Sequence, residues 1–181
     1  MKSFRGKLLL ATPELVDPNF NRSVVLIIEH TNDGAIGVVL NRRTELNSIE
    51  VLPKWDFHSP PDSILFWGGP VQQDSLLALG LLPQDQTAAH ESLLGRIIVI
   101  DLNQDIIDSE KLISARLYSG YAGWSPGQLN AEISSGGWIV VEVVDSDPFL
   151  DQPIDLWSEV LSRQQGFVSQ LAQYPDNPRM N

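Results

Sequence analysis

The sequence predicts a single α+β domain, in which a mixed, largely antiparallel twisted sheet or barrel-like core of about eight strands is flanked by roughly three to four helices. The apolar runs do not alternate regularly with helical patterns, which argues against a doubly wound α/β fold. The pair Asp33-Gly34 between two apolar runs is a hairpin signal and requires antiparallel pairing. A chain of 181 residues is long enough to bury a sizeable core.

The predicted strands follow the apolar runs in order. They are 7–11, 23–30, 35–40, 64–67, 75–82, 96–101, 115–119 and 138–144. An unbroken run such as 23–30, rich in β-branched residues, indicates a strand that is covered on both faces. The Leu-rich composition of 75–82 leaves a helix open as an alternative.

Four capped segments are predicted to be helical. They are a single turn over 49–52, a helix from Asn103 or Asp105 through 113, one over 126–134, and one that starts at 147–148 and ends at Gly166. The segment 83–94 is expected to be a polar surface loop. The domain covers 1–173, and 174–181 is expected to be a frayed tail.

The most heavily specified stretch is 120–138, which joins the last two predicted strands. Ser125 and Gln128 have capping-box spacing, so the Ser125 hydroxyl is expected to accept from the Gln128 backbone N–H while the Gln128 amide reaches back to the Ser125 N–H. Pro126 suits the first helical position. The pair Gly136-Gly137 suits a left-handed helix end.

Three interpretations of this stretch stay open. A glycine-rich loop before a helix can bind an anion, and Tyr121 with Trp124 can anchor a partner. A well-capped structural corner explains the same residues without a ligand. A serine nucleophile is excluded although 123–127 matches G-x-S-x-G, because Pro126 has no N–H to donate to an oxyanion.

Composition narrows the classes of function. The chain has no cysteine, which excludes disulfides and thiolate chemistry and fits the cytoplasm. It carries 23 acidic against 12 basic residues, a net charge of −11, and this acidic balance disfavours direct nucleic acid binding. No apolar run approaches the roughly 20 residues of a membrane helix. We therefore expect a cytoplasmic protein that does not enter the membrane.

No reaction centre is predicted. The three histidines are too few and too separated for a metal motif, so no metal, cofactor or catalytic residue is expected. His30 and Asp33 are expected to be ordinary surface polar residues. Glu132 and Glu142 could act as a general base only if they are buried.

Three glycine-containing motifs occur in order along the chain. They are FNRSVV at 20–25 with GAIGVVLNR at 34–42, GGPV at 68–71, and GYAGW at 120–124 with PGQL at 126–129 and Glu132. Together they resemble the bacterial YqgE/AlgH family over most of the chain. The resemblance implies a single cytosolic α+β domain with no agreed catalytic residues, often labelled a transcriptional regulator.

The motif positions at the ends of buried strands form the candidate site for a ligand or partner. They are Asn41, Arg42, Gly68, Gly69, Pro70, Tyr121, Gly123, Trp124, Gln128 and Glu132. Pockets form where strand ends and glycine-rich turns converge, so we expect one shared cleft, with independent corners of the fold as the alternative. Arg42 and Arg22 would favour an anionic group there.

These observations predict a non-catalytic binding or regulatory protein that acts through a protein partner or a small anionic ligand. Indirect transcriptional regulation and an unrecognised small-molecule enzyme are the alternatives.

Overall fold

A computed structural model describes residues 2–15, 17–58, 61–86, 92–103, 111–151 and 153–175. The strands are β1 (Lys7–Ala11), β2 (Val24–Thr31), β3 (Gly34–Val39), β4 (Arg43–Asn47), β5 (Ile64–Trp67), β6 (Val71–Leu81), β7 (Ser92–Leu94), β8 (Ile97–Val99), β9 (Ser114–Trp124) and β10 (Trp138–Glu142). The α-helices are α1 (Ser48–Val51), α2 (Gln128–Ser134), α3 (Leu156–Ser162) and α4 (Phe167–Gln170). Single 3₁₀ turns are η1 (Pro18–Phe20), η3 (Asp147–Phe149), η4 (Pro153–Asp155) and η5 (Leu171–Gln173).

The strands within these described ranges form one ten-stranded sheet. The order of its main strands is β10-β1-β2-β3-β9-β6-β8-β7. Strand β5 pairs with β9 outside this order, and β4 pairs with β5. The pairing of β5 with β9 is parallel and the other pairings are antiparallel. The order ends at β10 and β7, so the sheet is open rather than a closed barrel. The predicted α+β class with a largely antiparallel mixed sheet is confirmed.

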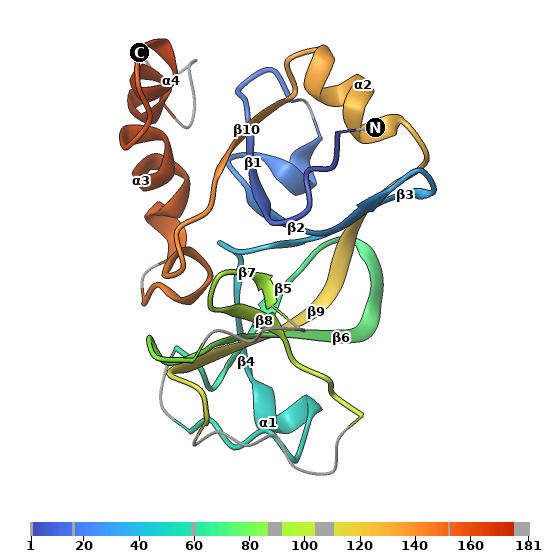
Figure 1. Ribbon diagram of the computed structural model, residues 1–181, viewed down its shortest axis with the longest axis vertical. Coiled ribbons are helices and arrows are strands. Elements are labelled where there is room, and N and C mark those ends of the chain that lie inside the picture. The colour runs from blue at the N-terminus through green and yellow to red at the C-terminus, as the bar shows by residue number, and fades with distance from the viewer. Residues whose placement is uncertain are drawn as a thin grey trace.

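The sheet is divided into two halves that share β9. Figure 1 shows β1, β2, β3, β10 and α2 in the upper half and β4 to β8 with α1 in the lower half. Strand β9 runs from the lower half into the upper one, where Ala35, Ile36 and Gly37 of β3 pair with it. Helices α3 and α4 lie beside β10 (Figure 1).

Both faces of the upper half are covered, as the unbroken apolar runs predict. Leu8 and Leu10 of β1 pack in one core with Trp157 of α3. Leu9, the residue between them, points into a second core with Leu129 of α2 and Trp138. Because successive side chains of a strand point to opposite faces, an uninterrupted apolar run fills two cores at once.

Glycines let two backbones cross where the halves meet. The Gly68 N–H donates to the Ser119 carbonyl and the Gly68 carbonyl accepts from the Val39 N–H, both at 2.8 Å. A Cβ on Gly68 or on Gly69 would lie closer than 3.0 Å to backbone atoms of β9. Gly120, at φ +71°, faces the Gly69 carbonyl in the same way. Only residues without a side chain allow this approach.

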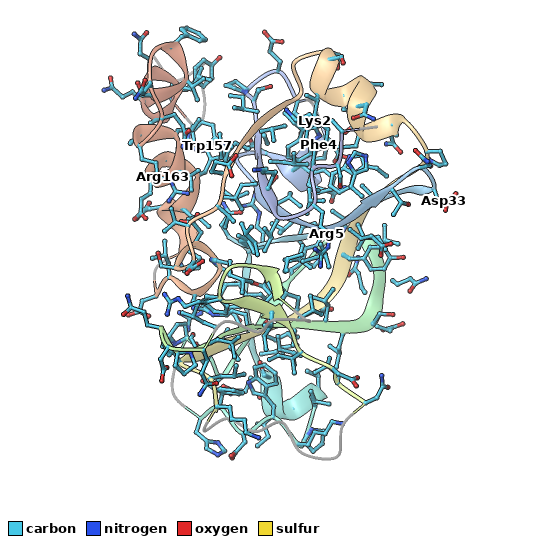
Figure 2. All side chains as sticks on the ribbon, in the orientation of Figure 1. Lys2, Phe4, Arg5, Asp33, Trp157 and Arg163 are labelled. Carbon is cyan, nitrogen blue, oxygen red and sulfur yellow. The ribbon has the colours of Figure 1, made fainter. Side chains whose placement is uncertain are left out.

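The C-terminal segment docks onto the sheet through polar contacts at its apolar core. The Trp157 Nε1–H donates to the Ala11 carbonyl at 2.9 Å, and Figure 2 shows Trp157 between α3 and the sheet. The Arg22 guanidinium lies 4.3 Å from the Trp157 ring centroid and donates to the Tyr174 carbonyl at 2.8 Å. The predicted tail therefore makes a tertiary contact at its first residue, and 176–181 lie outside the described residues.

Several element predictions need correction. The segment 75–82 is a strand, and β6 already begins at Val71. Strand β9 continues through the glycine-rich stretch to Trp124, which we expected to be a loop. Strands β4 and β7 were missed, since β4 is polar and mostly exposed and β7 has only three residues. The single helix predicted from 147–148 to Gly166 is instead η3, η4 and the shorter α3, and Gly166 precedes a further helix, α4, that was not expected. The predicted helix through 113 falls largely on 104–110, outside the described residues.

His30 is buried, which corrects the expectation of a surface residue. It is 7% exposed, its Nδ1 accepts from the Phe4 N–H at 3.1 Å, and its ring stacks on Phe4 with centroids 5.3 Å apart. Burial lowers the pKa of His30 from its ordinary value of 6.5. The folded protein thus holds the neutral ring with Nδ1 unprotonated.

The glycine crossing predicts a large loss of stability for one glycine-to-alanine change and little change for another. Gly68→Ala should lower the free energy of unfolding by about 3 kcal/mol or more, because the new methyl group overlaps backbone that cannot move aside. Gly123→Ala should change it by less than about 1 kcal/mol, because its Cβ meets nothing closer than 3.4 Å. Urea unfolding measures both. Equal stability of the two variants would refute the role of the crossing.

Neutral His30 predicts a pH-dependent stability. Because its pKa is lower in the folded state, the unfolded chain binds more protons, so the free energy of unfolding should fall as pH drops below 6.5. Urea unfolding between pH 7.5 and 5 measures the slope. A His30→Gln variant should have a shallower slope over this window, and an unchanged slope would contradict the prediction.

Candidate functional site

The turn before α2 differs in detail from the predicted capping box. The Gln128 N–H donates to the Ser125 carbonyl at 3.0 Å, and Gly127 has φ 76° and ψ −13°. These angles, with Pro126 in the preceding position, are those of a type II turn. The helix therefore begins at Gln128 and not at Pro126. The second half of the predicted box is present, since the Gln128 Oε1 accepts from the Ser125 N–H at 3.0 Å.

The end of α2 follows the predicted glycine cap. Gly136 has φ +85°, and its N–H donates to the Ile133 carbonyl at 3.1 Å. The Gly137 N–H donates to the Glu132 carbonyl at 2.9 Å. These two bonds form a Schellman motif, which turns the chain directly into β10. Trp138, the first residue of β10, is thereby returned toward Glu132.

Glu132 binds three side chains of this region. Its Oε2 accepts from the Nε1–H groups of Trp124 at 2.9 Å and Trp138 at 2.8 Å. Its Oε1 accepts from Gln128 Nε2 at 2.8 Å, one helical turn earlier. Trp124 and Trp138 are 7% and 3% exposed. A carboxylate offers about four acceptor positions, so three of those on Glu132 are occupied.

Three aromatic rings pack against one another beside Glu132. The centroids of Trp124 and Trp138 are 6.0 Å apart in an edge-to-face arrangement, and Phe20 lies 5.5 Å from Trp138 and 6.5 Å from Trp124. Such ring pairs contribute about 0.5–1.5 kcal/mol each beyond the area they bury. The indole N–H bonds to Glu132 set the orientation of the two tryptophan rings, and Phe20 packs against both.

A cavity of about 210 Å³ is bounded by these rings. It is lined by the candidate residues Pro70, Gly123, Trp124, Gln128 and Glu132. Leu15, Asp17, Phe20 and Trp138 complete the lining. The charged residues in its lining are Asp17 and Glu132, both carboxylates. Asp17 Oδ1 accepts a hydrogen bond from the Asn19 N–H at 2.9 Å.

A second cavity of about 190 Å³ lies at the β2–β3 hairpin and shares Trp124 with the first. Its lining includes Glu29, Asp33 and Ile36, and its charged members are again only carboxylates. We call the residues that line the two cavities the Trp124 surface.

The remaining candidate residues line neither cavity and make contacts within the fold. Gly68 and Gly69 lie at the backbone crossing, and Tyr121, half-buried, lies beside them in β9. Asn41 is 5% exposed, and its side chain accepts from the Val24 N–H at 3.0 Å and donates to the Arg22 carbonyl at 2.9 Å.

Arg42 also makes structural contacts. Its guanidinium donates to the carbonyls of Asn21 and Asn41, and burial lowers its pKa. Asn41 and Arg42 line neither cavity. The structure thus brings together five of the predicted positions at the first cavity: Pro70, Gly123, Trp124, Gln128 and Glu132.

Asp17, Phe20 and Trp138 were not predicted to be part of the site. Phe20 lies in the first motif and Trp138 follows the glycine pair, so both positions were marked in the sequence. Their convergence depends on pairing of β1 with β10, where Ala11 is opposite Trp138. No local pattern specifies that long-range pairing.

The described residues add two negative findings. No helix among them is long and apolar enough to cross a membrane. Over the same ranges, no three His, Cys, Asp or Glu side chains gather closely enough to hold a metal ion.

The open ten-stranded sheet with short flanking helices and an aromatic-walled cavity defines a single-domain α+β protein. The AlgH-like family, DUF179, matches residues 8–169, and the chain belongs to this family. A UPF0301 protein of Thermobifida fusca is 42% identical over 99% of this chain and 96% of its own length. Another, from Streptomyces avermitilis, is 40% identical over 100% and 97%.

Two solved structures share the fold. A crystal structure of a Corynebacterium diphtheriae protein superposes with a TM-score of 0.87 at 31% identity, covering 96% of this chain and 94% of that one. The solution structure of the AlgH protein from Pseudomonas aeruginosa gives a TM-score of 0.69 at 29% identity, covering 97% and 98%.

The Glu132 contacts predict a specific effect of Glu132→Gln. Glutamine has one acceptor oxygen in place of two, so one of the three donors must face an N–H group, and the free energy of unfolding should fall by about 1–3 kcal/mol. Two of the five indole resonances in a ¹H–¹⁵N spectrum should move. The matched control is Glu142→Gln, which removes an exposed pair with Lys7 and should cost less than about 1 kcal/mol. Unmoved indole resonances in Glu132→Gln would disprove the contacts.

Proposed function

We propose that this protein is a non-catalytic binding or regulatory protein of the bacterial cytosol, and that it acts through a protein partner held at the Trp124 surface. The observation that carries this proposal is the convergence of Pro70, Gly123, Trp124, Gln128 and Glu132 on one aromatic-walled cavity. Pockets with apolar walls and a few oriented polar groups are the usual form of binding sites.

The state of Glu132 supports binding rather than catalysis. A general base directs its acceptor positions at the group from which it removes a proton. Three of the roughly four acceptor positions of the Glu132 carboxylate are instead taken by Trp124, Trp138 and Gln128 of the protein itself, at 2.8–2.9 Å. Its role is to orient the aromatic wall.

The charge of the surface favours a protein partner over a small anion. Each cavity contains two carboxylates and no basic side chain in its lining. Arg22 and Arg42, which suggested an anion from the sequence, donate to backbone carbonyls and contribute to neither cavity. Aromatic side chains in a well-packed setting are typical anchors of protein interfaces.

A regulatory role, including transcriptional regulation, would operate through that partner. The net charge of −11 disfavours direct contact with DNA, because DNA binding depends on basic residues that neutralise phosphates.

In-cell photo-crosslinking tests this proposal. The photoreactive residue p-benzoylphenylalanine is placed at Ile36, a 37%-exposed apolar residue of the Trp124 surface. The matched control carries it at Ile49 of α1, which is 47% exposed and lies in the other half of the molecule. We expect a discrete protein adduct from position 36 and none from position 49. Absence of an adduct at 36, or the same adducts at both positions, would overturn the proposal.

A further inference from the structure

The residues before β1 cover the edge of β2 that β1 leaves open. The pairing of β1 with β2 ends before Ile27. The chain preceding β1 continues along the same edge, where the Gly6 N–H donates to the Ile27 carbonyl at 2.8 Å and the Ser3 hydroxyl donates to the His30 carbonyl at 3.0 Å. We call residues 3–6 the N-terminal strap. The strap therefore occupies the place of a paired strand along this part of β2.

The strap also contacts the lower half of the sheet. A Cβ built on Gly6 would meet the Leu94 Cβ at 3.4 Å and the Leu93 carbonyl at 3.5 Å, both in β7. Figure 2 shows Phe4 in the upper half of the molecule and Arg5 at the boundary with the lower half. Detachment of the strap would thus uncover the β2 edge and remove one contact between the two halves.

The side chain of His30 holds the strap in place. The Phe4 N–H donates to His30 Nδ1 at 3.1 Å, and the two rings stack with their centroids 5.3 Å apart and their planes 10° from parallel. One nitrogen of a neutral imidazole accepts a hydrogen bond, whereas both nitrogens of the charged ring donate. A proton on Nδ1 would set two N–H groups against each other. The bond between His30 and Phe4 therefore exists only while the ring is neutral.

The charged residues around His30 do not stabilise its charged form. Those next to the strap contacts are Lys2 and Arg5, which are both basic and exposed. Glu29 is exposed and, as the neighbour of His30 in β2, points to the other face of the strand. Strand β3, which pairs with this part of β2, has no charged residue, and Asp33 lies at the outer end of the hairpin (Figure 2). Burial, and not a neighbouring charge, lowers the pKa of His30.

We propose that His30 is a pH-sensitive switch: the neutral ring holds the N-terminal strap on β2, and protonation releases the strap and opens the β2 edge. This inference goes beyond the proposed function and does not depend on it. The ring is buried while the strap is in place and becomes accessible when the strap leaves. Protons therefore bind more readily to the open form, and a falling pH shifts the equilibrium toward it. An open strand edge can pair with another extended chain, so release creates an interaction surface.

Amide hydrogen exchange of the full chain, measured by NMR at pH 7.5 and 5.5, tests the switch. The Gly6 amide reports detachment of the whole strap, because its acceptor is the Ile27 carbonyl and not His30. Its protection factor should fall about threefold to tenfold, since at pH 5.5 an accessible imidazole of pKa 6.5 favours the charged form about tenfold. At both pH values it should be at least about tenfold below that of the Val39 amide, which bonds to Gly68. Unchanged Gly6 protection, or protection equal to that of Val39, would overturn the inference.

Two histidine variants identify the group that titrates. His30→Asn keeps an acceptor oxygen near the position of Nδ1 but does not titrate, so the pH dependence of Gly6 protection should disappear. Loss of the ring stack on Phe4 lowers its protection at both pH values alike. The matched control is His58→Asn, because His58 is exposed and pairs with Asp56, and here the pH dependence should persist. A pH dependence that survives in His30→Asn, or is lost in His58→Asn, assigns the effect to another group and excludes the switch.

A titration of the unchanged chain supplies a check that needs no substitution. The Cε1–H resonance of His30 in a ¹H NMR spectrum follows the protonation of the ring. Its midpoint should lie below pH 6.5, and Gly6 protection should fall over the same range, because one proton governs both. A midpoint at or above 6.5 means that the closed strap does not hold the ring neutral. Loss of Gly6 protection in a different pH range means that another group releases the strap. Either result contradicts the inference.

Discussion

The structure depends on the close approach of two backbones at Gly68, Gly69 and Gly120. Strand β9 pairs with β5 through Leu117 to Ser119 and then with β3 from Ala122 onward. The neighbour of β9 on this side changes within a few residues, and Gly68 fills the junction by bonding to Ser119 and to Val39. A side chain at any of these glycines would separate the strands and with them the two halves of the sheet. The close approach of the strands accounts for glycine at these three positions.

That crossing also positions the candidate site. After Gly120, β9 has crossed into the upper half, so Trp124 emerges beside Ala35 at the hairpin end of β3. The type II turn and the seven-residue helix α2 then reverse the chain, and the glycine cap returns it as Trp138 in β10. Glu132 lies on the helix between the two tryptophans and bonds to both. A helix this short has little stability of its own, so these bonds and the burial of Leu129 hold it in place.

The sequence specified the parts of the site whose causes are local. An apolar run predicts strand β5, which is present. Short-range hydrogen bonds account for the glycine end of α2 and for the bond between Gln128 and Ser125, and both are present. The helix start was misplaced because a Pro-Gly pair suits both a first helical turn and a type II turn. Asn41 and Arg42 were predicted as ligand groups because they are polar residues at a strand end. Their partners, Val24, Arg22 and Asn21, are brought to them only by tertiary pairing.

The distribution of charge explains why the site is acidic. Three arginines fasten the C-terminal segment to the sheet: Arg22 bonds to Tyr174, Arg96 to Asp145 and Arg116 to Leu150. Arg163 bonds to Asp147 within that segment. Arg116 is fully buried over the Phe66 ring, and burial lowers its pKa. With only 12 basic residues against 23 acidic ones, carboxylates are in excess even where arginines pair with aspartates. The carboxylates of Glu29, Asp33 and Asp17 lie around Trp124, with no basic residue in the same cavity linings. Arg22, Arg96 and Arg116 are engaged with the C-terminal segment, away from these two cavities, so the carboxylates in the cavity linings have no cation beside them.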